Sequence, residues 1–270
     1  VYESIITAAD LENGFFFTVN GDRFVMKNSE LHGCGWGPED PEKLQKMLYH
    51  KSRQLGMSPE WGTFGLLDIA TDGAVIEGNL ISNNYGVVAL QGSRINLANN
   101  AIHSNSGIPV IIFGGEEYIV GNQIQHSTPL GTYGPCIGLY GQGNNTIKDN
   151  YISGEGTGET VGGLFGICTY SNRSFNNTIT NNTICDVTCL GIVLGMGVVS
   201  SNNSVIGNTI SSMGEAAIYV YGRSNKIADN NIISCGTGID LTYSYGNVVA
   251  NNNISEITLG LKLTGQEPYD

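Results

Sequence analysis

The chain of 270 residues is long enough for one hydrophobic core, and a solenoid of this length can be a single domain over residues 1–270. Its formal net charge is −12 with only 12 lysines and arginines, which argues against nucleic acid as a partner. No apolar run approaches the roughly 18 residues that a membrane-spanning helix needs.

The first 35 residues are predicted to be β structure. Segments 15–19 and 23–28 are expected to form an imperfect first coil, in which Val25 and Asn28 match the repeat that follows and Leu31 falls one residue late. No signal peptide is visible, but residue 1 is Val rather than an initiator Met, which is consistent with a leader that has been removed.

Residues 36–62 break the pattern and are predicted to form a short helical insert. Asp40 is a good capping residue and Pro41 suits the first helical position. An apolar stripe at helical spacing follows, formed by Leu44, Met47, Leu48 and Leu55. We expect this helix to lie over the first coils and cover apolar surface; a docking or assembly element is the alternative.

Residues 64–264 contain one pattern eight times, each time around an asparagine. An isoleucine stands two residues after each asparagine and a branched aliphatic residue stands three residues before it. A period near 22 residues, with insertions confined to certain turns, is typical of a solenoid of eight coils. The eight asparagines are Asn79, Asn100, Asn122, Asn150, Asn182, Asn208, Asn230 and Asn252.

The spacing of the aliphatic residues predicts a corner at each asparagine. Side chains on one face of a strand recur every second residue, so two aliphatics five residues apart cannot both point inward from one straight strand. Asn tolerates the left-handed conformation of a sharp turn, and its amide can hydrogen-bond to the same residue of the next coil, as in an Asn ladder. Coils stacked about 4.8 Å apart would form parallel sheets around an aliphatic interior.

This repeat resembles the right-handed parallel β-helix superfamily, which includes pectin lyases and hydrolases, alginate epimerases, phage tailspikes and NosD-like periplasmic and archaeal surface proteins. The resemblance covers about residues 64–264 and is closest in style to the NosD-like proteins. It implies an all-β, right-handed parallel β-helix of about nine coils, but it says little about function. Copper is associated with the NosD-like name, and no residues here support carrying it over.

Cysteines and glycosylation sequons favour a location outside the cytoplasm. Cys185 with Cys189 and Cys136 with Cys168 are candidate disulfides, and buried free thiols are the alternative. Six Asn-x-Ser/Thr sequons start at Asn144, Asn172, Asn176, Asn181, Asn202 and Asn253. Together they favour an extracellular or cell-surface protein, with the periplasm as the alternative.

The sequence contains no recognisable catalytic, metal or cofactor constellation. The motifs of the β-helix hydrolases and epimerases are missing. The predicted outward column has an apolar middle, which argues against a stacked carboxylate site for calcium; it runs through Asp68, Ala89, Ile111, Gly138, Cys168, Val193, Tyr219, Asp240 and Lys262.

Acids that could pair are Glu116, Glu117, Asp149, Glu155, Glu159 and Glu215. His103 and His126, on successive coils, are expected to be structural rather than an acid/base or copper pair.

A second predicted outward column is aromatic. It could form a platform for sugar rings or an interface for another subunit, and a stripe covered by the chain's own loops is the third reading. Its members are Phe113, Tyr140, Tyr170 and Tyr221, with Tyr219 alongside.

Two functions from different classes remain, and the first is preferred. The first is a non-enzymatic extracellular protein that associates with copies of itself in a surface layer, sheath or filament, because neither end of the solenoid carries a convincing polar cap. The second is a β-helix that binds or degrades a polysaccharide, which follows by analogy from the fold. Neither hypothesis requires a cofactor or a membrane span.

Overall fold

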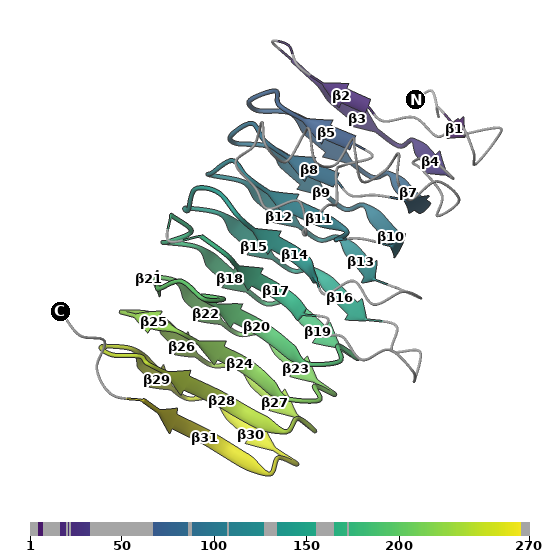
Figure 1. Cartoon of the computed structure of the whole chain (residues 1–270). Coiled ribbons are helices and arrows are strands. Elements are labelled where there is room, and N and C mark those ends of the chain that lie inside the picture. The colour runs from purple at the N-terminus through teal and green to yellow at the C-terminus, as the bar shows by residue number, and fades with distance from the viewer. Residues whose placement is uncertain are drawn as a thin grey trace, which may run out of the picture.

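The computed structural model describes residues 5–7, 17–19, 21, 23–32, 67–85, 88–106, 108–126, 134–154, 165–171 and 173–265. The helical insert expected at 36–62 lies outside these residues. Within the described part the chain is all β, and strands from successive coils pair in parallel (Figure 1). No segment of this part forms a helix that could cross a membrane.

Three sheets, named A, B and C, run along the stack of coils. Sheet A contains β1 (Ile5–Thr7), β4 (Glu30–His32), β7 (Leu80–Tyr85), β10 (Ala101–Ser106), β13 (Gln123–His126), β16 (Tyr151–Gly154), β19 (Thr183–Cys185), β23 (Thr209–Ser211), β27 (Asn231–Ile233) and β30 (Asn253–Ser255). Sheet B contains β2 (Phe17–Val19), β5 (Leu67–Ile69), β8 (Val88–Leu90), β11 (Val110–Ile112), β14 (Pro135–Leu139), β17 (Phe165–Thr169), β20 (Leu190–Leu194), β24 (Ala216–Val220), β28 (Thr237–Thr242) and β31 (Leu259–Thr264). Sheet C contains β3 (Val25–Lys27), β6 (Val75–Glu77), β9 (Asn96–Ala98), β12 (Tyr118–Val120), β15 (Thr146–Lys148), β18 (Thr178–Thr180), β22 (Ser204–Ile206), β26 (Lys226–Ala228) and β29 (Val248–Ala250). A small extra pair is formed by β21 (Ser200–Ser201) and β25 (Gly222–Arg223).

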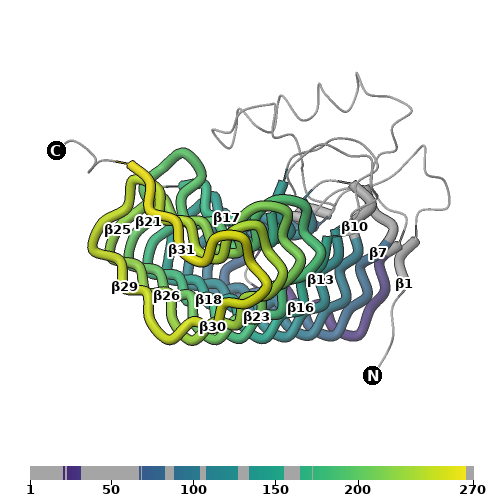
Figure 2. Tube along the Cα trace, turned by 90° about the horizontal axis from the view of Figure 1, so that it is seen from below, coloured from purple at the N-terminus to yellow at the C-terminus, as the bar shows by residue number. Residues whose placement is uncertain are grey.

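Each coil passes through sheet B, then sheet C, then sheet A, and the coils lie over one another (Figure 2). From β2–β4 to β28–β30 the described residues form nine complete coils, so the predicted right-handed parallel β-helix of about nine coils is confirmed.

The register stacks identical residues in the interior. Ile124 pairs with Ile152, which in turn pairs with Ile184. The aliphatic residues on both sides of each asparagine are almost fully buried from Ile76 to Ile232. The prediction that these aliphatic residues point into the interior is therefore confirmed.

The turn from sheet C to sheet A differs in one respect from the expectation. The residue before the asparagine, not the asparagine itself, adopts the left-handed conformation; Asn99 has φ 55° and Asp149 has φ 56°. The asparagine does not have a positive φ, and both its main-chain N–H and its side chain bond to the next coil. Gly, Asn or Asp therefore occupies the left-handed position, because the left-handed conformation is unfavourable for most other residues.

The first coil is in regular register, which corrects the expected match of Val25 and Asn28. Met26 pairs with Ile76 and Leu31 pairs with Ile81. Asn28, with φ 48°, is the left-handed residue, and Ser29 takes the place of the asparagine. Leu31 is thus not displaced; it is buried, whereas Val25 is 45% exposed.

Candidate functional site

The eight predicted asparagines form one continuous ladder at the corner between sheets C and A. From Asn100 onward, each Oδ1 accepts the main-chain N–H and the Nδ2 of the asparagine in the preceding coil, as in Asn122 to Asn150, where both distances are 2.9 Å. Each Nδ2 also donates to a main-chain carbonyl, such as that of Ile119 from Asn150 at 2.8 Å. The buried amides are saturated, so this ladder is a structural element.

A second ladder, which the sequence reasoning missed, lies at the corner between sheets B and C. Its members each stand five residues before a member of the first ladder, and this constant spacing was the signal that could have revealed it. Adjacent amides bond in the same way, at 2.8 to 3.1 Å. The members are Asn145, Asn177, Asn203, Asn225 and Asn247.

Glu117 occupies the same ladder position one coil before Asn145, and its side chain is completely buried. Its N–H donates to Asn145 Oδ1 at 3.0 Å, and its Oε2 accepts the N–H of Ile95 at 2.6 Å. The other oxygen, Oε1, has no hydrogen-bond partner. Burial raises the pKa of Glu117 to about 8, with a smaller contribution from the charges of Asp72 and Glu116. This carboxyl therefore belongs to the interior and not to an exposed acid pair with Glu116.

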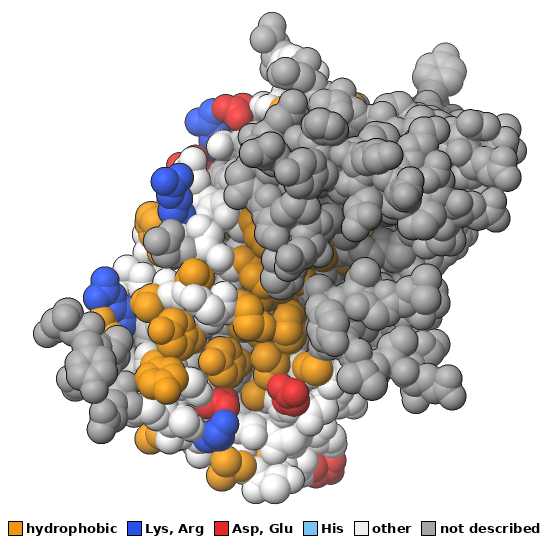
Figure 3. Space-filling view, in the orientation of Figure 1, with side chains coloured by type: hydrophobic (Ala, Val, Ile, Leu, Met, Phe, Trp, Pro, Cys, Tyr) orange, Lys and Arg blue, Asp and Glu red, His pale blue; other side chains and the backbone are white. Residues whose placement is uncertain are grey.

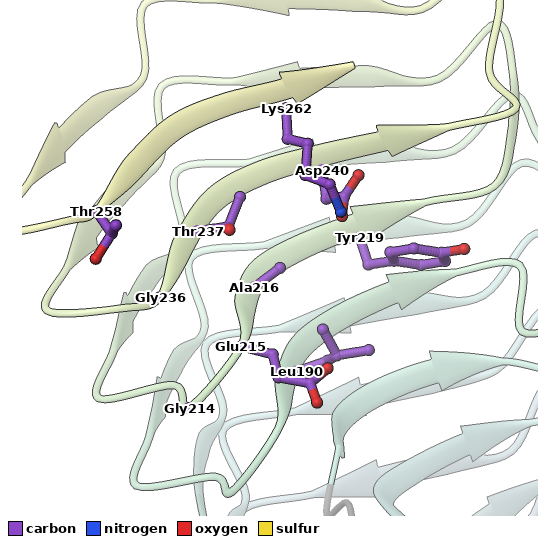
Figure 4. A pocket seen from close by; sticks show the side chains of 10 residues that line it. All are labelled: Leu190, Gly214, Glu215, Ala216, Tyr219, Gly236, Thr237, Asp240, Thr258 and Lys262. Carbon is purple, nitrogen blue, oxygen red and sulfur yellow. The ribbon is translucent and has the colours of Figure 1, made fainter. Parts of the chain in front are cut away.

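An open groove lies on the outer face of sheet B, across β20, β24, β28 and β31 (Figures 3 and 4). Its volume is about 640 Å³, which is within the range of ligand sites. We call it the outer groove; it is lined by Leu190, Gly214, Glu215, Ala216, Tyr219, Gly236, Thr237, Asp240, Thr258 and Lys262. Leu190 and Ala216 contribute an apolar part of the lining, while Thr237 and Thr258 provide hydroxyl groups.

The register brings the charged residues of the outer groove together. Tyr219 pairs with Asp240, which pairs with Lys262, so the three side chains leave sheet B side by side. Lys262 Nζ lies 2.7 Å from Asp240 Oδ2, and Thr242 donates to Asp240 Oδ1 at 2.8 Å. The bond to Asp240 raises the pKa of Lys262. Partial burial and the charge of Asp240 raise the pKa of Tyr219, so its ring enters the groove as a neutral phenol.

The predicted aromatic stripe is divided into two parts. Tyr140 stacks on Tyr170 with centroids 4.4 Å apart, and Phe113 lies 5.9 Å from Tyr140. These three rings are partly buried and pack against apolar residues of the outer face of sheet B. Tyr221 contacts Tyr243 instead, edge to face at 6.0 Å. Of the predicted aromatic residues in the described part, Tyr219 alone lines the outer groove.

The expected disulfides are not formed, because all four cysteines are free. Cys136 lies in the main core, whereas Cys168 packs in a cluster on the outer face of sheet B, so the two point to opposite sides. Cys185 Sγ lies 3.3 Å from the hydroxyl of Tyr151, and Cys189 packs against the outer cluster.

The two histidines do not approach each other. His103 is in register with Gln125, while His126 is in register with Ser104, so the histidine side chains alternate to opposite faces. His126 is buried, and burial lowers its pKa to about 4.

The remaining candidates lie on the surface or outside the described residues. Asp149 lies at an exposed corner, and its Oδ2 is 3.4 Å from Lys148 Nζ. Glu155, Glu159 and the sequon residue Asn172 are not among the described residues, nor is the side chain of Asp68. The other sequon asparagines are exposed: Asn144, Asn176, Asn181, Asn202 and Asn253.

Two family models match the chain. The model described as "Right handed beta helix region" matches residues 64–203, which is more than half of the chain. The chain belongs to the right-handed β-helix family. The model described as "Periplasmic copper-binding protein (NosD)" matches residues 160–265 of this β-helix protein. Copper sites use imidazole, thiolate or thioether ligands, and within the described ranges no three His, Cys, Asp or Glu residues gather to hold a metal. Among the described residues, His, Cys, Asp and Glu therefore supply no three-ligand site for copper.

Solved structures with the same fold include a tailspike, an epimerase and an adhesin. The Dettilon tailspike protein gp208 is 17% identical with a TM-score of 0.51, over 87% of this chain and 54% of the tailspike. The periplasmic alginate epimerase AlgG is 12% identical (TM-score 0.49, 88% and 60%), and PfbA, a surface adhesin of Streptococcus pneumoniae, is 13% identical (TM-score 0.48, 88% and 63%). This β-helix chain thus spans 54 to 63% of the length of these proteins. The likeness to the tailspike, at 17% identity, shows the fold alone. No curated protein matches the sequence significantly.

Proposed function

We propose that this β-helix protein is an extracellular or surface protein that binds a polysaccharide in the outer groove. The observation that carries the proposal is the juxtaposition of Tyr219 with Asp240, Lys262 and Glu215 around an open groove. Sugar rings combine apolar faces with hydroxyl groups, so they suit a partly buried aromatic ring next to charged groups that can accept or donate hydrogen bonds. The match of residues 160–265 to a family model described as periplasmic supports a location outside the cytoplasm.

Binding, rather than hydrolysis, is the activity that these residues support. Glycoside hydrolysis generally requires two carboxyl groups, one as acid and one as base or nucleophile. In the outer groove Asp240 has both oxygens engaged, by Thr242 and by Lys262, which leaves Glu215 as the remaining carboxylate of the lining.

The proposal predicts that Tyr219→Ala weakens oligosaccharide binding about tenfold, which corresponds to about 1.4 kcal/mol of lost ring contact. Isothermal titration calorimetry with neutral, cationic and anionic oligosaccharides measures this. The matched control is Tyr118→Ala, because Tyr118 is 52% exposed on sheet C, outside the groove. Binding that is equally weakened by both variants, or absent for every oligosaccharide, would contradict the proposal.

Self-association is a second candidate function, supported by an exposed aromatic cluster at the corner between sheets B and C. Tyr243 and Tyr245 form this cluster and are 49% and 38% exposed. Phe175, at the same corner three coils earlier, is 39% exposed. Arg223 Nη1 donates to the hydroxyl of Tyr245 at 2.6 Å. Tyr, Phe and Arg are enriched at protein interfaces, and we propose that the partner is a second copy of this chain.

If copies associate through this cluster, the double variant Tyr243→Ser/Tyr245→Ser is expected to shift the particle size toward the monomer. Light scattering at micromolar concentration measures the size, and Tyr118→Ser again serves as the matched control. A wild-type protein that is monomeric at these concentrations would rule this candidate out.

A further inference from the structure

The outer groove contains three charged side chains, and two of them neutralise each other. Asp240 is 10% exposed and Lys262 is 44% exposed, with the ion pair between them at 2.7 Å. The second oxygen of Asp240 accepts the hydroxyl of Thr242. The ammonium group of Lys262 is therefore already paired with a carboxylate that is held in place, and it is not a free receptor for an anionic ligand.

Glu215 supplies the remaining charge of the groove. It lies at the turn from sheet A to sheet B, immediately before β24, and its side chain is exposed. Its main chain is fixed, because its N–H donates to the carbonyl of Cys189 at 2.9 Å and its carbonyl accepts the N–H of Thr237 at 2.7 Å. None of the ion pairs found within the described residues includes Glu215, and Figure 4 shows its carboxylate beside Leu190 at the lining of the groove.

The sum of these charges is −1, on a chain whose formal net charge is −12. A polymer of uronic acids would bring its carboxylates against Glu215 and against the field of the whole chain. An amine-bearing polymer would instead be attracted to both. The apolar lining and Tyr219 remain available for the sugar ring in either case.

We infer that the outer groove selects a saccharide carrying free amino groups, with Glu215 as the residue that pairs with the ammonium group and Tyr219 as the ring contact. This inference rests on the proposed function of the same groove. It assigns opposite roles to two lining residues, since Glu215 attracts the ligand while Lys262 masks Asp240.

The test compares a fully deacetylated chitosan oligosaccharide with its N-acetylated form and with an alginate oligosaccharide, by calorimetry on the full chain at low and physiological salt. Chitosan is expected to bind most tightly and to weaken with salt, because exposed charge pairs are screened. Glu215→Gln should weaken chitosan binding about two- to fivefold, as expected for an exposed ion pair. Asp229→Asn, which removes an exposed charge at a different corner, is the matched control.

Lys262→Met supplies a test in the opposite direction. It leaves the Asp240 carboxylate without its cation, so chitosan should bind about two- to fivefold more tightly. Tighter binding of alginate than of chitosan, or weaker chitosan binding by Lys262→Met, would overturn the inference while leaving polysaccharide binding intact. If the N-acetylated oligosaccharide bound as tightly as chitosan, the inference would also be overturned. If Tyr219→Ala did not weaken oligosaccharide binding, the proposed function itself would be contradicted.

Discussion

Replacing Asn150 with alanine is expected to lower the free energy of unfolding by about 3 kcal/mol. Asn150 Oδ1 accepts two bonds from Asn122, and Asn150 Nδ2 donates to the Ile119 carbonyl and to Asn182. The alanine variant leaves the buried N–H of Asn122 and the carbonyl of Ile119 without these partners. Each unsatisfied buried group costs about 1 to 3 kcal/mol.

Equilibrium unfolding in guanidinium chloride measures the loss as a shift of the midpoint. The matched control is Asn253→Ala, which removes an exposed side-chain bond to Asn231 and should cost less than about 0.5 kcal/mol. Equal losses in the two variants would mean that the buried ladder contributes no more than a surface asparagine.

A second large effect is expected from pH. The folded-state pKa of Glu117 is raised from 4.5 to about 8, so the folded chain holds a proton that the unfolded chain releases. Stability is therefore greatest below the unfolded value and falls as pH rises toward the folded value. Between pH 6.5 and 9 this amounts to about 2 kcal/mol.

His126 acts in the opposite direction at lower pH. Its folded-state pKa is lowered from 6.5 to about 4, so its contribution is present above pH 6.5 and is lost as pH falls toward 4. The two effects oppose each other between pH 4.5 and 6.5, which places the visible fall in stability above pH 6.5.

The variant Glu117→Gln isolates the carboxyl group. A carboxamide cannot ionise, so the difference in unfolding free energy between the variant and the wild type should grow in the variant's favour from pH 6.5 to 8.5. Denaturant titrations at several pH values measure this difference. The control is Glu116→Gln, which changes an exposed neighbour. A difference that does not change with pH would show that Glu117 is ionised in the folded chain.

The fold could be predicted because its signal is repeated. Each coil has the same asparagine with aliphatic residues at fixed distances, so one error, such as the register at Asn28, did not change the architecture. The second ladder has the same spacing but occupies only five coils, and it stands next to exposed asparagines, as Asn145 does beside Asn144, which made it harder to detect.

The candidate site was only partly predicted. The sequence placed Tyr219, Asp240 and Lys262 in one outward column, and the register of β24, β28 and β31 confirms this order. The ion pair between Asp240 and Lys262 and the groove around it were not predicted, because they depend on side-chain conformations and on the turns beside the column. Glu215 reaches the groove from a turn, and turns carry no inward-outward alternation. The prediction of disulfides was wrong because the proximity of two coils does not tell on which face of a strand a cysteine lies.

The three corners of the coil differ in how constant their length is. Every passage from sheet C to sheet A uses two residues, such as Gly78 and Asn79, whereas the passage from sheet A to sheet B ranges from residues 86–87 to residues 33–66. Glu215 and Thr258 stand in the variable passage. Evolution can thus add or delete codons beside the groove without disturbing either column of amides. Descendants of one ancestor should consequently diverge first in what they recognise, and only much later in how they are built.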